Sequence, residues 1–181
     1  KNQLSKISQN NLTSPTQSKL DLIIKLYSSG QIQDALSSLE LLINDYPHDP
    51  SLFNIRGACF KANNQMESAV DSFKNAINIK PDYAEAYFNL GITIQELNNP
   101  NEAIKYYEKA ISIKPAYPTA HNNLGLIFLG LSQLDSAAEH FNWAISYNPE
   151  FAEAQNNLGA TLQQNREFDE SIKHYLKATT I

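Results

Sequence analysis

The sequence predicts an all-α fold, an α-solenoid in which antiparallel helix pairs stack one after another. Two observations predict it. Several residue types recur every 34 residues, and each period holds two apolar stretches of helical spacing separated by a polar break. Because a single helix pair cannot bury its apolar face, each pair is expected to pack against its neighbours. The predicted repeat domain covers 16–181, after a polar segment at 1–15 that is expected to be disordered or packed on the first repeat.

The period is visible in independent series of residues that share one register. One series is glycine, one is proline, and one is a large apolar residue: Gly57, Gly91, Gly125, Gly159; Pro47, Pro81, Pro115, Pro149; Leu39, Phe73, Tyr107, Phe141, Tyr175. The repeats that these series delimit are 16–49, 50–83, 84–117, 118–151 and 152–181. Small residues such as Gly91 and Ala103 are expected to let the two helices of a repeat approach closely.

Helix start and stop signals agree with this division. Asn99 is expected to cap a second helix that begins at Pro100, with Glu102 in the first turn. Pairs of the same kind, expected to act as capping boxes, are Asn64 with Glu67 and Ser132 with Asp135. Pro50 and Pro118 are expected to open the first helices of two later repeats.

The order of residues within a repeat resembles the tetratricopeptide repeat (TPR) family. The third unit carries it through Tyr87, Leu90, Gly91, Ile94, Ala103, Tyr107, Ala110 and Pro115, and the resemblance extends over 16–181. It implies a right-handed superhelix of antiparallel helices with a concave groove lined by the first helix of each repeat.

The positions that line this groove in the family are rich in amides here. We expect the peptide-binding residues to be Asn54, Asn89, Asn122, Asn123, Asn156, Asn157, Gln95 and Gln163. Asn89, Asn123 and Asn157 occupy one position in three successive repeats, a ladder similar to that in the TPR region of the O-linked N-acetylglucosamine transferases. That resemblance implies recognition of peptide backbone. The alternative is that these amides satisfy the scaffold itself.

Composition excludes several classes of function. A net charge of −5 argues against nucleic-acid binding, and no stretch is long and apolar enough for a membrane span. The single cysteine, Cys59, is interpreted as a small buried hydrophobe, and we expect a cytoplasmic location. His140 and His174 are interpreted as surface residues too far apart to share a metal. No catalytic, cofactor or metal motif is present, so a non-enzymatic scaffold for a protein or peptide partner is predicted.

Three alternatives accompany this prediction. Trp143 stands where other repeats carry polar residues, so it marks either a convex contact site or a cover for an apolar seam. Ile172, Tyr175 and Leu176 are expected to be poorly buried in the last helix, which favours a homo-oligomer formed through this repeat. The chain is alternatively the targeting arm of a larger enzyme of the glycosyltransferase or sulfotransferase type.

Overall fold

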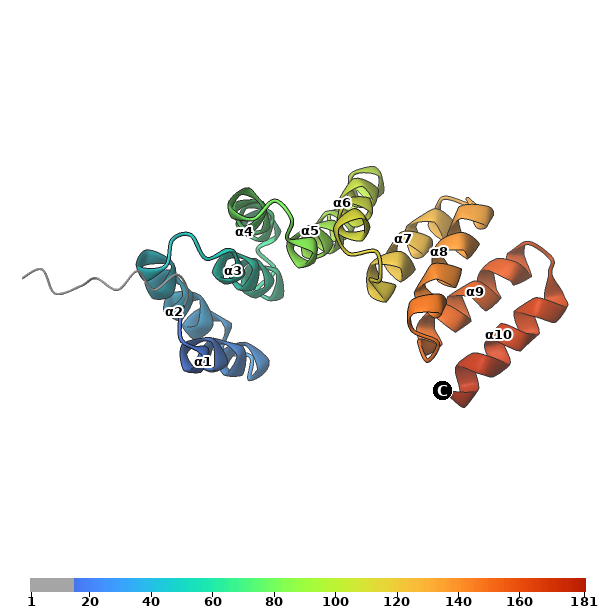
Figure 1. The fold of residues 1–181 in the computed structure, drawn as a ribbon, viewed down its shortest axis with the longest axis horizontal. Helices are drawn as coiled ribbons and strands as arrows, with labels where there is room; N and C mark the ends of the chain where they lie inside the picture. The colour runs from blue at the N-terminus through green and yellow to red at the C-terminus, as the bar shows by residue number, and fades with distance from the viewer. Residues whose placement is uncertain (1–14) are drawn as a thin grey trace, which may run out of the picture. The chain divides into compact units, whose positions relative to one another are not determined.

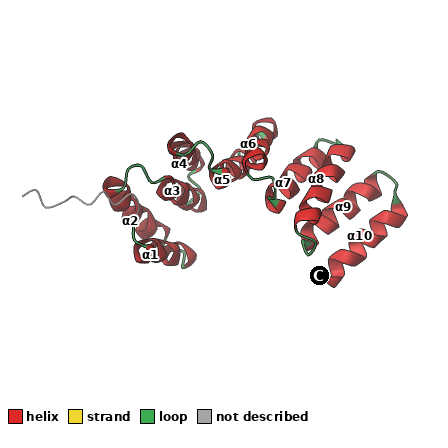
Figure 2. Cartoon of the chain, in the orientation of Figure 1, coloured by secondary structure: helices red, strands yellow, loops and turns green. Residues whose placement is uncertain are grey.

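The computed structural model describes residues 15–181, which form ten α-helices and no strand (Figure 1, Figure 2). The predicted all-α helical repeat is therefore confirmed. Residues 1–14, which make up all but the last residue of the predicted polar segment at 1–15, lie outside the described residues. The helices are α1 (Gln17–Ser28), α2 (Ile32–Asp45), α3 (Pro50–Ala62), α4 (Met66–Ile79), α5 (Ala84–Glu96), α6 (Pro100–Ile113), α7 (Pro118–Gly130), α8 (Leu134–Tyr147), α9 (Ala152–Gln164) and α10 (Phe168–Thr180).

Contacts between helices divide the chain into two units, one ending at Pro81 and the other beginning at Asp82. In the first unit α1 packs on α2, α2 on α3, and α3 on α4. In the second unit α5 pairs with α6, α7 with α8 and α9 with α10, while α6 contacts α7 and α8 contacts α9. Each helix pair thus contacts the next pair within its unit, which is how a repeat array builds a continuous core.

The turn inside each repeat has one backbone conformation, which the capping boxes did not predict. Five residues spaced 34 apart have positive φ: Gly30 (77°), Asn64 (57°), Asn98 (60°), Ser132 (59°) and Arg166 (64°). The backbone N–H of the next residue donates a hydrogen bond to a carbonyl of the first helix. For example, the N–H of Gln133 donates to the carbonyl oxygen of Phe128 at 2.9 Å. This is the Schellman end of a helix. Ser132 and Asn64 therefore terminate first helices and do not cap second helices, so that prediction is wrong.

Other predicted helix starts agree with the structure. Pro50, Pro100 and Pro118 open α3, α6 and α7. Asp49 caps α3, because its carboxylate accepts a hydrogen bond of 2.9 Å from the N–H of Ser51. Asn99 is the residue before α6, but its side chain donates to the carboxylate of Glu102 at 2.8 Å and makes no bond to the helix backbone.

A glycine of the first helix lies against an aromatic ring of the second helix in four repeats. A Cβ atom added at Gly125 would lie 2.7 Å from Cε1 of Phe141, and one added at Gly91 would lie 2.9 Å from Cδ1 of Tyr107. Both rings are completely buried. The glycine series therefore exists because the ring occupies the volume that a side chain would need.

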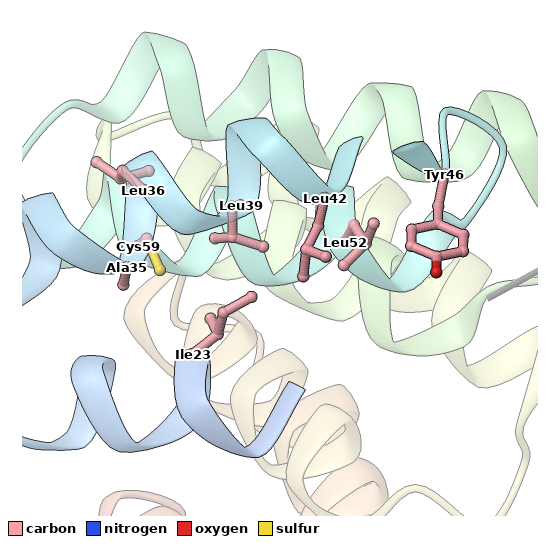
Figure 3. Packing of buried hydrophobic residues seen from close by; sticks show 8 residues of the cluster. All are labelled: Ile23, Ala35, Leu36, Leu39, Leu42, Tyr46, Leu52 and Cys59. Atoms are coloured by element: carbon pink, nitrogen blue, oxygen red, sulfur yellow. The ribbon is translucent and has the colours of Figure 1, made fainter. Parts of the chain in front are cut away.

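One buried cluster in the core of the first unit is mainly aliphatic. Its residues come from α1, α2 and α3 and from Tyr46, which directly follows α2 (Figure 3). They are Ile23, Ala35, Leu36, Leu39, Leu42, Tyr46, Leu52 and Cys59. Ile23 is buried at the position where later repeats carry glycine. Burial raises the pKa of the Cys59 thiol to about 11, so the side chain is a neutral packing residue, as the sequence predicted.

Candidate functional site

The three ladder asparagines lie at equivalent places on first helices of the second unit. Asn89, Asn123 and Asn157 are each the sixth residue of their helix, α5, α7 and α9 respectively, and each is half-buried. The backbone carbonyl of Asn89 accepts a hydrogen bond of 2.8 Å from the hydroxyl of Thr93. Asn157 does the same with Thr161 at 2.8 Å. These positions are therefore held on regular helix.

The side chain of Asn123 belongs to a chain of hydrogen bonds that joins three helices. Asn123 Nδ2 donates to Tyr107 Oη at 3.4 Å, and Tyr107 Oη donates to Gln95 Oε1 at 2.8 Å. Burial raises the pKa of Tyr107 to about 12, so its hydroxyl keeps its proton and can donate. The scaffold thereby orients the amides of Asn123 and Gln95 together.

Asn157 is oriented by a neighbouring first helix. Its Nδ2 donates to Asn122 Oδ1 at 3.0 Å, and Asn122 Nδ2 donates to Glu153 Oε1 at 3.0 Å. Asn122 is only 1% exposed. Its predicted place among the groove residues is wrong, because α9 covers this position of α7 and both ends of the amide are bonded inside the protein.

Each of the two oriented amides retains hydrogen-bonding capacity. An asparagine side chain has two N–H donors and one carbonyl acceptor. Asn123 and Asn157 each use one donor within the protein, and the structure of residues 15–181 shows no partner for either carbonyl oxygen. Peptide binding and satisfaction of the scaffold, the two alternatives for the ladder, are thus compatible. In each side chain one N–H bonds to the scaffold, while the other N–H and the C=O stay accessible.

The other predicted groove residues have different surroundings. Gln163 is exposed and accepts a hydrogen bond of 2.9 Å from the hydroxyl of Tyr175, which repeats the pairing of Gln95 with Tyr107. Asn156 is exposed on α9. Asn54 lies in the first unit, where it lines a hollow of about 200 Å³ with apolar side chains of α1 and α3.

The comparisons identify the repeat. A protein-family model described as TPR repeat matches residues 57–98 and 96–132 of the sequence. A second family model, described as tetratricopeptide repeat, matches residues 122–181. The chain belongs to the tetratricopeptide repeat family. Among curated proteins, the comparison found no match to this TPR chain.

Solved structures share the TPR fold. The crystal structure of MamA has a TM-score of 0.78 at 24% identity and covers 88% of this chain and 94% of its own. The structure from a functional characterization of Pseudomonas aeruginosa pilF has a TM-score of 0.84 at 18% identity, with 90% and 74% covered. YrrB, a TPR protein described as having an unusual peptide-binding site, has a TM-score of 0.69 at 18% identity, with 91% and 84% covered. At these identities the likeness shows the fold alone.

Trp143 lies on the second helix of a TPR repeat and is 46% exposed. Its ring stacks on Tyr147 with centroids 5.9 Å apart and lies 6.3 Å from the ring of His121. The tryptophan therefore covers part of an aromatic cluster while it leaves nearly half of its own surface accessible. Its role as a convex contact site stays a prediction.

The histidines of the fourth TPR repeat form a pair that sequence reasoning missed. His121 Nδ1 lies 3.2 Å from His140 Nδ1, and His121 Nε2 lies 3.1 Å from the carbonyl oxygen of Pro115. His121 is 5% exposed and His140 is half-buried, so the interpretation of His140 as a surface residue is wrong. The signal lies in the repeat register. His121 and Gln155 are the fourth residues of α7 and α9, and each contacts the histidine of the following second helix, since Gln155 Oε1 lies 2.7 Å from His174 Nδ1.

The hydrogen-bond geometry assigns the protons of this pair. A carbonyl only accepts, so His121 Nε2 carries a proton, and in the neutral pair His140 Nδ1 then donates to His121 Nδ1. Burial lowers the pKa of His121, opposed by the carbonyl of Pro115. Burial also lowers the pKa of His140, with a further lowering from His121 and an opposing effect of Glu139. Burial therefore favours the neutral form of both histidines in the folded chain.

Acidification is expected to destabilise the second unit through this pair. Both folded-state pKa values are lowered, so the unfolded chain takes up protons first as the pH falls below about 6.5. The stabilisation is complete above that pH and is lost as the pH falls toward the lowered values, at up to about 1.4 kcal/mol per pH unit for each proton taken up. Urea unfolding between pH 7.5 and 5 measures this slope.

A matched variant isolates the contribution of the pair. His121→Gln should keep a hydrogen bond to His140, as Gln155 keeps one to His174. The variant should therefore fold at neutral pH and lose stability less steeply on acidification than the parent chain. An unchanged slope in this variant would contradict the assignment.

The residues that the structure describes show neither a metal-binding cluster nor a membrane-spanning helix. No group of three or more His, Cys, Asp or Glu side chains there is placed to hold a metal ion. None of the described helices has the length and hydropathy needed to cross a membrane.

Proposed function

We propose that this TPR chain is a protein-interaction scaffold that binds an extended peptide of a partner along the amides of Asn89, Asn123 and Asn157. The observation that carries the proposal is the state of Asn123 and Asn157. Each is oriented by a hydrogen bond to the scaffold and retains a donor and an acceptor. A peptide unit offers the complementary N–H and C=O, so one side chain can bond both groups.

The spacing of the repeats supports this ligand. Packed helices lie roughly 8–10 Å apart, and an extended chain advances about 3.3 Å per residue. One ladder asparagine would then meet the peptide backbone at about every third residue. Because the bonds go to backbone groups, binding would tolerate many ligand sequences.

Useful affinity requires that the asparagine side chains are already oriented before the peptide binds. A hydrogen bond contributes only about 0.5–1.5 kcal/mol net, so a few of them give weak binding if the side chains must also be ordered. The hydrogen bonds that Asn123 and Asn157 donate to Tyr107 and Asn122 hold both amides in place in the absence of ligand. This pre-organisation reduces the entropic cost of binding.

Asn123→Ala is the sharpest test of the ladder. The probe is a labelled peptide selected from a random library on the wild-type chain, and binding is followed by fluorescence anisotropy. We expect about a 10-fold loss of affinity, equivalent to the loss of one or two hydrogen bonds. Stability should change little, because Tyr107 keeps its bond to Gln95.

Two further variants complete this experiment. Asn142→Ala, which changes an exposed asparagine on α8, should leave affinity and stability unchanged. Asn157→Ala should weaken binding and also destabilise the fold by about 1–3 kcal/mol, because it leaves the buried Asn122 carbonyl without its donor. Wild-type affinity in Asn123→Ala would disprove the role of the ladder.

Self-assembly through α10 is a second candidate, and the exposure of its apolar side chains favours it. Phe168, Ile172 and Leu176 are spaced four residues apart on one helix face and are 57%, 55% and 61% exposed. Leu176 occupies a position where earlier repeats carry Glu40, Lys74, Glu108 and Asn142. Light scattering over a concentration series should show association that Leu176→Glu abolishes; a concentration-independent monomer mass would exclude it.

The role as a targeting arm of a glycosyltransferase or sulfotransferase stays a prediction, which the parent reading frame would test.

A further inference from the structure

Two aromatic rings lie on the exposed side of α8. Trp143 and Tyr147 stand about one helical turn apart and are 46% and 40% exposed. Their rings are nearly parallel, at an angle of 20° with centroids 5.9 Å apart. The residues that correspond to Trp143 in α6 and α10 are Lys109 and Lys177, and both are exposed. An uncharged ring surface therefore stands where the neighbouring second helices carry a cation.

A buried imidazole holds both rings in place. The ring centroid of His121 lies 6.3 Å from that of Trp143 and 5.7 Å from that of Tyr147, at interplanar angles of 32° and 33°. His121 itself is only 5% exposed. Because contact with a buried ring restricts the two side chains before any ligand arrives, binding at their exposed surface costs little side-chain entropy.

The charges around these rings are all negative. No Lys or Arg occurs anywhere in 115–165, a stretch that contains the whole of α7, α8 and α9. The same stretch has four acids and so accounts for −4 of the net charge of −5; the acids are Asp135, Glu139, Glu150 and Glu153. Glu139 precedes Trp143 by four residues, which places the two exposed side chains next to each other on the helix. Carboxylates and the faces of aromatic rings both attract cations.

Lys114 shows how such a combination holds a cation within this chain. Its Nζ lies 4.6 Å from the ring centroid of Tyr117 and 3.3 Å from Glu85 Oε1. On α8 the carboxylate of Glu139 and the two exposed rings provide the same groups. No ion pair or cation–ring contact involves these three side chains within residues 15–181. The cation that complements them therefore has to come from another molecule.

We propose that Glu139, Trp143 and Tyr147 form a binding site for an arginine side chain in a basic segment of a partner protein. A guanidinium group is planar and weakly hydrated, so it stacks on aromatic rings, and its paired N–H groups match a carboxylate. The site goes beyond the proposed function, because the ladder lies on first helices and bonds to peptide backbone, whereas this site lies on a second helix and reads a charged side chain.

The emission of Trp143 reports on the site directly, because it is the only tryptophan. The probe is a capped peptide of alternating arginine and serine, and its control carries citrulline, an uncharged analogue, in place of each arginine. At an ionic strength of about 0.15 M, which screens long-range attraction, the arginine peptide should change the emission saturably. It should bind about tenfold more tightly than the citrulline peptide. Equal affinities, or emission unchanged by the arginine peptide, would overturn the inference.

A charge-matched pair of variants separates this site from general attraction to an acidic protein. Asp71 occupies in α4 the position that Glu139 occupies in α8, and it is exposed, but Asn75 stands four residues later in place of a tryptophan. Glu139→Gln should weaken binding of the arginine peptide about threefold to fivefold. Asp71→Asn removes the same charge and should leave the affinity nearly unchanged. Equal weakening by the two variants would show that no specific site exists.

The contribution of the ring is tested by Trp143→Leu and Trp143→Tyr, with binding measured by calorimetry. Leucine keeps an apolar cover over the cluster but has no aromatic face, so affinity for the arginine peptide should fall about fivefold. Tyrosine keeps an aromatic face and should recover most of that loss, which a purely structural role of the side chain does not predict. Unchanged affinity in Trp143→Leu would contradict the site, and the titration of the unsubstituted chain does not depend on how either variant folds.

Discussion

Replacing Phe141 with alanine is expected to lower the free energy of unfolding of the second unit by about 3–5 kcal/mol. The ring is completely buried and packs against Gly125, in a cluster with Ala137 and Leu158. Helices on both sides of the ring are held by other contacts, so the cavity cannot collapse fully. Trp143 is the only tryptophan and lies on the same helix, so its fluorescence follows the loss of this unit in urea.

Asn142→Ala provides the control for this substitution. Asn142 is exposed and adjacent to Phe141, so its truncation should change stability by no more than about 0.5 kcal/mol. A destabilisation below about 1 kcal/mol in Phe141→Ala would mean that the ring does not support the packing of α7 on α8.

Gly125→Ala should destabilise the chain, whereas Gly130→Ala on the same helix should not. At Gly125 the new methyl group would lie 2.7 Å from the buried ring of Phe141, which must move at a cost of about 1–3 kcal/mol. At Gly130 the methyl group meets nothing within 4 Å, and alanine favours helix over glycine by up to about 1 kcal/mol. Urea unfolding of the two variants measures both effects.

The comparison is matched because both substitutions replace a glycine of α7 with alanine and add one methyl group. Any difference between them reports on the surroundings of the two glycines. Equal stabilities would show that the ring of Phe141 can yield without cost, and the explanation of the glycine series would then fail.

Much of the fold follows from local pattern. The recurrence of Gly125 and Phe141 in register with their counterparts indicates a helix pair, because the small residue and the ring need each other to pack. Pro50 and Pro118 locate helix starts, since proline fits the first turn, where no donor is lost. These signals act within a few residues or within one repeat, so periodicity is enough to find them.

The turns were harder to predict. Ser132 looks like a helix cap by composition, yet it adopts a left-handed conformation that ends the preceding helix. Gly30 alone among the five turn residues carries the usual signal for that conformation. The hydrogen bonds of the Schellman ending stabilise it for Asn, Ser and Arg as well.

The sequence by itself determined the repeat, its period and the helix face on which the asparagines stand, because these depend on spacing along one chain. Tertiary structure decided which amides are accessible. Asn122 and Asn123 are neighbours of the same type, yet packing of α9 buries the first and leaves the second half-exposed. The pairing of His121 with His140 and the open space at Gly130 have the same origin. Each depends on which atoms of another helix occupy the adjoining volume, and spacing along the chain does not contain that information.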